Sequence, residues 1–305
     1  TPDVYRSQKR GGKGVLGMAT KEEDFIDNLF VANSHDYLLC FSSFGRVYWI
    51  KVYELPQGSR NSRGKPIINL LPLAEGEKIN AILPVKGFSD TEYVFMATAR
   101  GTVKKTPLSA FSNRRSAGII AVDLDEGDYL IGAAVTSGNS EVMLFSDAGK
   151  AVRFDEADVR PMGRNARGVR GMELGDTQQV IGMLVSNEET SQVLTATANG
   201  YGKRTPIGDY RKSRRGTQGV IAIDTGERNG ALVAVALVAD SDELMLMTTG
   251  GVLIRTRVSE VRETGRAAQG VRLINLDAGE QLVSLEKIAE SDEPDDTDET
   301  APEQD

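Results

Sequence analysis

Two kinds of segment recur along this chain at intervals of about fifty residues, and they restrict the fold to one built from small repeated units. In the first kind, an apolar run is followed by a turn ending in glycine and then by a second strand-like run, as in YVFMATARGTVKKTPL from Tyr93. This pattern predicts a β-hairpin whose turn glycine has a positive φ. The five hairpin glycines are separated by 48 to 56 residues: Gly45, Gly101, Gly149, Gly200 and Gly251.

The second kind of segment carries its own glycine, followed by a short strand-like run, an acidic turn and another apolar run such as Tyr129–Val135. Four short strands per repeat are typical of small sheets arranged radially. We therefore expect an all-β, propeller-like disc, a β-pinwheel, with six blades of four strands. The six glycines of this second family are spaced by 50 to 54 residues: Gly14, Gly64, Gly118, Gly168, Gly219 and Gly270.

The second family has one copy more than the hairpins, and the chain opens on Thr1-Pro2, the pair that follows a hairpin at Thr106-Pro107 and Thr205-Pro206. We therefore expect a domain excised from a longer protein.

The formal net charge of −8 comes entirely from the C-terminal end. Residues Ser291–Asp305 contain eight acidic and no basic residues, so the remaining 36 acidic residues equal the 36 Lys and Arg. Acidic segments without aromatic residues bury too little apolar surface to fold. We therefore divide the chain into a folded domain, 1–290, and an acidic disordered tail, 291–305. Whether the tail aids solubility or inhibits the domain stays open.

Residue usage excludes several classes of function. One cysteine, Cys40, and one histidine, His35, leave no basis for a disulfide framework, a Cys-rich metal site or His-based catalysis. No apolar run reaches the roughly 18–20 residues of a membrane span. We expect no metal site, no cofactor and no membrane partner in this domain, and a location in a reducing cytoplasm.

Basic residues gather around the second-family glycines. Thirteen-residue windows at the six glycines hold 20 basic and 5 acidic residues, while acidic residues cluster just after each window. In a radial repeat, residues of equal phase lie at equal positions, so one edge of the disc should carry a positive belt. The candidate contacts are Gln8, Lys9, Arg10, Gly11, Gly12, Lys13, Gly14, Arg60, Arg63, Lys65, Lys104, Lys105, Arg114, Arg115, Arg164, Arg167, Arg170, Lys203, Arg204, Arg211, Lys212, Arg214, Arg215, Arg255, Arg257, Arg262, Arg266 and Arg272.

A belt of Lys and Arg among small residues is suited to a polyanion held by its phosphates. Aromatic residues are few in these windows, which argues against base stacking, and no helix is available to read a major groove. Bending 20–30 base pairs by 40–90° costs about 1–6 kcal/mol, which six distributed clusters could offset. The pattern therefore favours wrapping of duplex DNA without sequence-specific readout.

The heptad Gln8-Lys9-Arg10-Gly11-Gly12-Lys13-Gly14 resembles the signature box of the C-terminal domain of the DNA gyrase A subunit. The segments Phe44-Gly45-Arg46-Val47-Tyr48 and Thr102-Val103-Lys104-Lys105-Thr106 resemble the same family. The resemblance implies a six-bladed β-pinwheel that wraps DNA in a chiral sense. It also implies a role in negative supercoiling near the nucleoid, within a heterotetramer with the rest of gyrase A and gyrase B. ATP and Mg would bind elsewhere in that enzyme, and this fragment alone would be catalytically silent.

Other interpretations remain. The related domain of topoisomerase IV typically lacks an intact box, which favours gyrase. A propeller serving as a protein-interaction scaffold would carry its surface charge only for solubility. Gly12–Gly17 fits G-x-G-x-x-G formally, but the sequence shows neither the strand before it nor the helix after it that this motif requires, so a nucleotide site is not expected.

Overall fold

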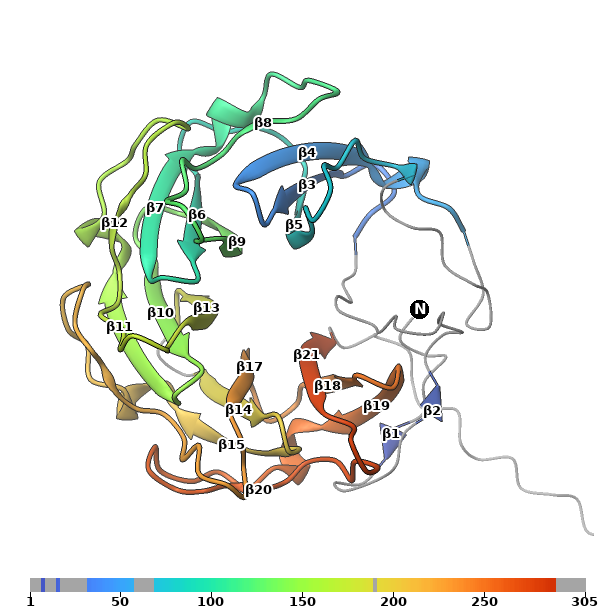
Figure 1. Cartoon of the computed structure of the whole chain (residues 1–305), viewed down its shortest axis with the longest axis vertical. Helices are drawn as coiled ribbons and strands as arrows, with labels where there is room; N and C mark the ends of the chain where they lie inside the picture. The colour runs from blue at the N-terminus through green and yellow to red at the C-terminus, as the bar shows by residue number, and fades with distance from the viewer. Residues whose placement is uncertain (1–6, 9–14, 17–31, 58–68, 189–190, 289–305) are drawn as a thin grey trace, which may run out of the picture.

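The computed structural model describes residues 7–8, 15–16, 32–57, 69–188 and 191–288, which form five small sheets around a central axis (Figure 1). The middle of every sheet is an antiparallel hairpin. The hairpins are β3–β4 (Tyr37–Ser42, Arg46–Lys51), β6–β7 (Tyr93–Thr98, Thr102–Pro107), β10–β11 (Glu141–Ser146, Lys150–Asp155), β14–β15 (Gln192–Thr197, Tyr201–Pro206) and β18–β19 (Glu243–Thr248, Val252–Arg257).

Each hairpin has an inner strand on the side of the axis and an outer strand at the edge of the disc (Figure 1). The inner strands are β5 (Ile79–Val85), β9 (Leu130–Thr136), β13 (Val180–Ser186), β17 (Leu232–Val238) and β21 (Leu282–Ile288). The outer strands are β8 (Ile119–Ile120), β12 (Val169–Arg170), β16 (Val220–Ile221) and β20 (Val271–Arg272).

Outer strands are exchanged between neighbouring blades. In the chain, β8 lies between β7 and β9, yet it pairs with β4 of the preceding blade, where Val47 faces Ile119. The chain then returns to its own hairpin, because β9 pairs with β6. The same exchange places β12 on β7, β16 on β11 and β20 on β15. Each blade is therefore completed by the repeat that follows it.

The β18–β19 blade is completed by the N-terminal end of the chain. Strand β2 (Val15–Leu16) pairs antiparallel with β19, in the position that the other outer strands occupy. Strand β1 (Ser7–Gln8) pairs parallel with β19, with Ser7 opposite Arg255. Equivalent parallel bridges join Lys105 to Pro161, Arg153 to Lys212 and Arg204 to Glu263. The first and last parts of the folded chain thus meet in one sheet.

Glycines of both families allow the close approach of backbone segments. Gly149, in the β10–β11 turn, has φ 76°, and a Cβ there would lie 2.3 Å from the Ile223 carbonyl oxygen. Gly219, which precedes β16, has φ 78°, and a Cβ there would lie 2.1 Å from the Ala151 carbonyl oxygen. A side chain at either position would therefore separate the outer strand from its hairpin.

The core consists of apolar layers between successive blades. One layer joins Leu39 and Phe41 of β3 to Val94 and Met96 of β6. Both faces of each hairpin are buried, so the hairpin strands contain little solvent-facing surface. A short 3-10 helix follows each hairpin: η2 (Val52–Glu54), η4 (Leu108–Phe111), η5 (Glu156–Asp158), η6 (Ile207–Asp209) and η7 (Val258–Glu260).

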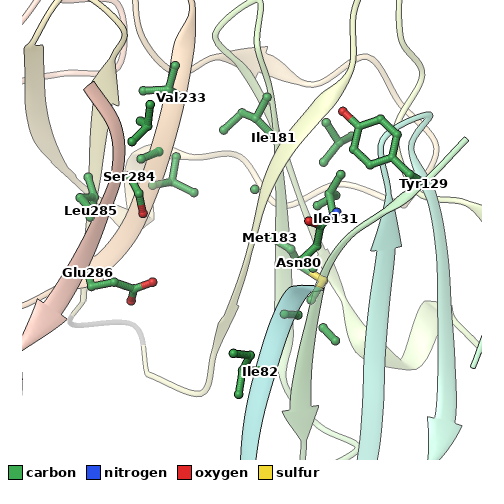
Figure 2. A pocket seen from close by; sticks show the side chains of 18 residues that line it. Asn80, Ile82, Tyr129, Ile131, Ile181, Met183, Val233, Ser284, Leu285 and Glu286 are labelled. Atoms are coloured by element: carbon green, nitrogen blue, oxygen red, sulfur yellow. The ribbon is translucent and has the colours of Figure 1, made fainter. Parts of the chain in front are cut away.

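A cavity of about 480 Å³ lies between the inner strands (Figure 2). Most of the residues that line it are apolar, and Figure 2 shows the Glu286 carboxylate directed toward it. Burial raises the pKa of Glu286 to about 7. Within the described part of the chain, no three His, Cys, Asp or Glu side chains gather so that they could hold a metal ion.

The prediction of an all-β, propeller-like fold with small four-stranded sheets is confirmed. The described residues form five blades rather than the predicted six. The sixth would require the first repeat, most of which lies outside the described residues, as does the predicted tail 291–305. No helix of the described residues is both long and apolar enough to cross a membrane.

Candidate nucleic-acid interface

The outermost surface of the disc is formed by the outer strands and by four segments that lead into them, which we call the rim loops: residues 112–118, 160–168, 211–219 and 262–270 (Figure 1). Ten of the predicted cations are exposed, nine of them on these elements and Arg257 at the end of β19. They are Arg114, Arg115, Arg167, Arg170, Arg211, Lys212, Arg214, Arg257, Arg262 and Arg272. These ten side chains therefore face solvent, and their contact with a polyanion stays a prediction.

Three half-buried arginines link the outer strands of adjacent blades. Nη1 of Arg164 donates a hydrogen bond to the Ile120 carbonyl oxygen at 3.0 Å. In the same way, Nη1 of Arg215 donates to the Arg170 carbonyl oxygen at 3.0 Å, and Nη1 of Arg266 donates to the Ile221 carbonyl oxygen at 2.9 Å. Each bond runs from a rim loop to the outer strand of the neighbouring blade. These bonds hold the guanidinium groups at the edge of the disc.

The spacing of these arginines in the sequence is more regular than the overall charge of the thirteen-residue windows around the second-family glycines. An arginine stands four residues before each of the six second-family glycines: Arg10, Arg60, Arg114, Arg164, Arg215 and Arg266. In the first rim loop the guanidinium of Arg114 lies over the Tyr37 ring, 4.4 Å from its centroid.

The structure corrects the predicted exposure of Lys104 and Lys203, whose side chains are 1% and 0% exposed. Nζ of Lys104 donates to the carbonyl oxygens of Ala121, at 2.6 Å, and Arg164. Nζ of Lys203 donates to those of Gly265, at 2.7 Å, and Arg266. Burial, together with the charges of Arg164 and Arg266, lowers the pKa of each lysine to about 8. These ammonium groups support the rim loops from behind and cannot reach a phosphate.

Lys105, Arg204 and Arg255 also do not lie in an exposed belt. They share one position on the second hairpin strand with Arg153 and Trp49. In this position Arg204 Nε donates to the Val261 carbonyl oxygen at 2.6 Å, and Lys105 Nζ to that of Glu156 at 3.4 Å. Arg255 is paired with Glu243, from Nε to Oε2 at 2.6 Å. The Arg204 and Lys105 bonds join a hairpin to the 3-10 segment of the next blade, so these side chains connect blades.

Several exposed cations already have acidic partners. Lys212 lies 2.8 Å from Glu141 and 2.7 Å from Asp155, and Arg167 bridges Asp123 and Asp125 at 3.3 and 3.1 Å. Pairs as exposed as those of Arg167 contribute little free energy, so a phosphate can replace the carboxylate at small cost.

Two exposed arginines at the rim are absent from the sequence-based set. Arg160 is separated by 51 residues from Arg211 and is exposed like Arg211 and Arg262. Arg228 stacks on the Tyr201 ring, 4.2 Å from its centroid, while Arg272 lies over the same ring and its Nη2 donates to the hydroxyl at 2.6 Å. Arg228 precedes an inner strand in an acidic turn, outside the windows around the second-family glycines. The sequence pattern therefore did not select it.

The remaining candidates lie partly or wholly outside the described residues. Gln8 is in β1, opposite Thr256. Lys9, Arg10, Gly11, Gly12, Lys13 and Gly14 join β1 to β2 and are not described; nor are Arg60, Arg63 and Lys65. By register, the segment between Ser7 and Gly14 has the same length as the rim segments Pro161–Gly168, Lys212–Gly219 and Glu263–Gly270.

Exchanged four-stranded blades around an axis, with exposed arginines on the outer edge, define this chain as a β-propeller with a basic rim. The chain belongs to the family described as DNA gyrase C-terminal domain, beta-propeller, whose model matches residues 3–33, 36–86, 92–137, 140–187, 191–239 and 242–289.

Individual relatives agree. The chain is 53% identical to the DNA gyrase A subunit of Neisseria gonorrhoeae over 330 residues, with 94% of this chain and 36% of the relative covered. It is 52% identical to the DNA gyrase A subunit of Escherichia coli K12 over 294 residues, with 96% and 34% covered. The chain thus spans about a third of the length of these relatives.

Solved structures are similar as well. A structure of the DNA gyrase A C-terminal domain aligns with a TM-score of 0.84 and 28% identity, covering 95% of this chain and 94% of that chain. A structure of the C-terminal domain of DNA topoisomerase IV aligns with a TM-score of 0.75 and 25% identity, covering 84% and 80%.

Proposed function

We propose that this chain binds duplex DNA without sequence preference and wraps it around the rim. It would do so as the C-terminal domain of a DNA gyrase A protein, in the cytoplasm, at the nucleoid. The observation that carries the proposal is the repetition of exposed arginines in successive rim loops, together with Arg170 and Arg272 on two of the outer strands. A curved line of cations binds a polyanion through its phosphates and offsets the cost of bending it.

The partners follow from the same proposal. The remainder of gyrase A and gyrase B would form a heterotetramer with this domain, and ATP and Mg would bind in those other parts. The domain itself would supply no catalytic group and take no cofactor. Its contribution would be a chiral wrap that directs strand passage toward negative supercoiling.

We also propose that a sixth blade lies between the β18–β19 blade and the β3–β4 blade and takes in residues 17–33, because β1 and β2 already belong to the β18–β19 blade. Along β3, Leu39 and Phe41 pack toward the β6–β7 blade, so the alternate residues Leu38 and Cys40 face the other way, yet they are buried in a separate cluster. On β18, Met245 and Met247 likewise face away from the β14–β15 blade and are buried. The two faces flank the one interval of the ring where described residues form no blade (Figure 1). The first segment of the family match falls on residues 3–33.

Relaxation of circular DNA tests the wrap. A relaxed circle is incubated with increasing amounts of this domain and a type I topoisomerase, and the topoisomers are separated after protein removal. We expect a protein-dependent change in linking number whose sign gives the handedness. Binding without any change would refute wrapping.

Salt dependence tests the scaffold alternative. A wrapper releases many counterions, so log K should fall steeply with log salt concentration. A protein-interaction scaffold would show no duplex binding at low salt. The 53% identity to a gyrase relative favours gyrase over topoisomerase IV as the enzyme that contains this domain.

A further inference from the structure

Among the described outer strands, β8 and β16 each expose an isoleucine. Ile120, the second residue of β8, is 44% exposed, and Ile221, the second residue of β16, is 52% exposed. Their predecessors Ile119 and Val220 are half-buried and pack on the core, as expected when alternate strand residues face opposite sides. Burial therefore explains why the first residue of each of these two strands is apolar. It does not explain why the exposed second residue is an isoleucine.

The same position alternates in character around the rim. The second residue of the outer strand is Ile120, Arg170, Ile221 and Arg272 in four successive blades. Arg170 and Arg272 are exposed and can meet a phosphate. The edge of the disc therefore presents an apolar side chain and a cation in turn.

Each exposed isoleucine has an arginine fixed beside it. Arg164 donates to the carbonyl oxygen of Ile120 at 3.0 Å, and Arg266 to that of Ile221 at 2.9 Å. The lysines behind the rim fix these arginines in turn, because Lys104 and Lys203 bind the arginines' own carbonyl oxygens. An apolar group and a guanidinium are thus presented together, twice, two blades apart.

We propose that Ile120 and Ile221 contact the sugar walls of the DNA minor groove where it faces the disc, while Arg170 and Arg272 hold the flanking phosphates. This inference rests on the proposed DNA wrapping. A narrowed minor groove has a strong negative potential that attracts arginine, and apolar side chains are the usual companions of arginine in proteins that bend DNA through that groove. The charge and the apolar surface of each pair match that environment.

The test uses two double variants of nearly equal shape. Ile120→Val/Ile221→Val keeps an apolar side chain, whereas Ile120→Thr/Ile221→Thr places a hydroxyl at the same branch point. We expect the Val variant to bind and wrap like the parent. We expect the Thr variant to lose half or more of the linking-number change per bound domain and about threefold to tenfold in affinity. Its salt slope should stay unchanged, because no phosphate contact is removed.

Control variants separate the apolar contact from other causes. Arg170→Ala/Arg272→Ala should lower the salt slope by about 2, and Phe44→Ser, at an exposed aromatic in the β3–β4 turn, should change neither slope nor wrap. Thermal unfolding of the Thr variant should match the parent, since both isoleucines are exposed. Duplexes with uracil in place of thymine should retain the Val–Thr difference.

Three results would overturn the inference. Equal wrapping by the parent, Val and Thr variants would leave the isoleucines facing solvent. A lowered salt slope in the Thr variant would mean that its loss of wrapping and affinity comes from a displaced arginine. Loss of the Val–Thr difference on uracil-containing DNA would place the contact at thymine methyl groups in the major groove. Failure of the parent to bind any duplex would instead refute the proposed function itself.

Discussion

The guanidinium of Arg153 on β11 donates from Nη1 to the backbone carbonyl oxygen of Tyr210, 3.1 Å away in the segment after η6 of the next blade. It also donates to the Ile207 carbonyl oxygen at 3.2 Å, and its Nε to Glu141 at 2.7 Å. The indole nitrogen of Trp49 makes the equivalent bond to Phe111 at 3.0 Å. In four of the five described hairpins, a side-chain donor at this position thus bonds to a backbone carbonyl oxygen of the next blade.

Replacing Arg153 with methionine should destabilise the domain by about 2–4 kcal/mol. The variant keeps an apolar stem, but two buried carbonyl oxygens lose their donor and Glu141 loses a partner. Denaturant unfolding followed by tryptophan fluorescence and circular dichroism measures the loss. Arg160→Met, at an exposed arginine, is the matched control and should stay within about 0.5 kcal/mol of the parent. Equal stabilities of the two variants would show that the blade contact is held by apolar packing alone.

Glu286 should make stability fall as pH rises from about 4.5 to about 7. In the folded state burial raises its pKa to about 7, from 4.5, so over this window the folded chain binds more protons than the unfolded chain. Its stabilising contribution is complete below pH 4.5 and is lost as pH passes 7, a change of about 2–3 kcal/mol.

Glu286→Gln removes this titration, so it should be more stable than the parent at pH 8 and differ little at pH 4.5. Unfolding midpoints at the two pH values give the comparison, with Glu126→Gln, in an exposed acidic turn, as control. A parent advantage at pH 8 would mean that the Glu286 carboxylate has a stabilising partner.

Lys104 and Lys203 should make stability rise between about pH 8 and 10.5. Their folded pKa values are about 8, against 10.5 in the unfolded chain, so in this window the unfolded state binds more protons. The contribution is complete above pH 10.5 and is lost as pH falls through 8, about 3 kcal/mol for each lysine. The unfolding free energy of the parent, relative to that of Lys104→Met/Lys203→Met, should therefore increase from pH 7.5 to pH 10. Lys86→Met/Lys287→Met, at exposed lysines, should show no such shift.

Alanine at Lys9, Arg10 and Lys13 should weaken wrapping more than binding. The described rim arginines would still hold DNA, but the path would lose its cations between β1 and β2. The linking-number assay should lose most of its signal while affinity at low salt falls less than about tenfold. Lys78, Lys86 and Lys287, which adjoin or lie on inner strands, provide a control with the same change in charge. Parallel loss of wrapping and affinity in the box variant would contradict a special role for this segment.

The sequence by itself determined the repeat, the hairpins and the turns. Gly149 and Gly219 show why. A positive φ and a close backbone approach admit only glycine, so the glycine itself marks these turns in the sequence. Exposed cations such as Arg170 and Arg211 were also predictable, because the windows around the second-family glycines lie outside the apolar runs. The sixth blade stays a prediction.

The tertiary structure alone decided which cations face solvent and which blade each outer strand completes. Lys104 is buried because the Arg164 carbonyl oxygen, 60 residues further along the chain, lies against its Nζ. In a propeller both faces of a hairpin pack on neighbouring blades, so alternation along the strand does not distinguish a solvent face from a buried one. Whether a basic residue meets DNA or a carbonyl group therefore depends on distant backbone, which no local pattern encodes.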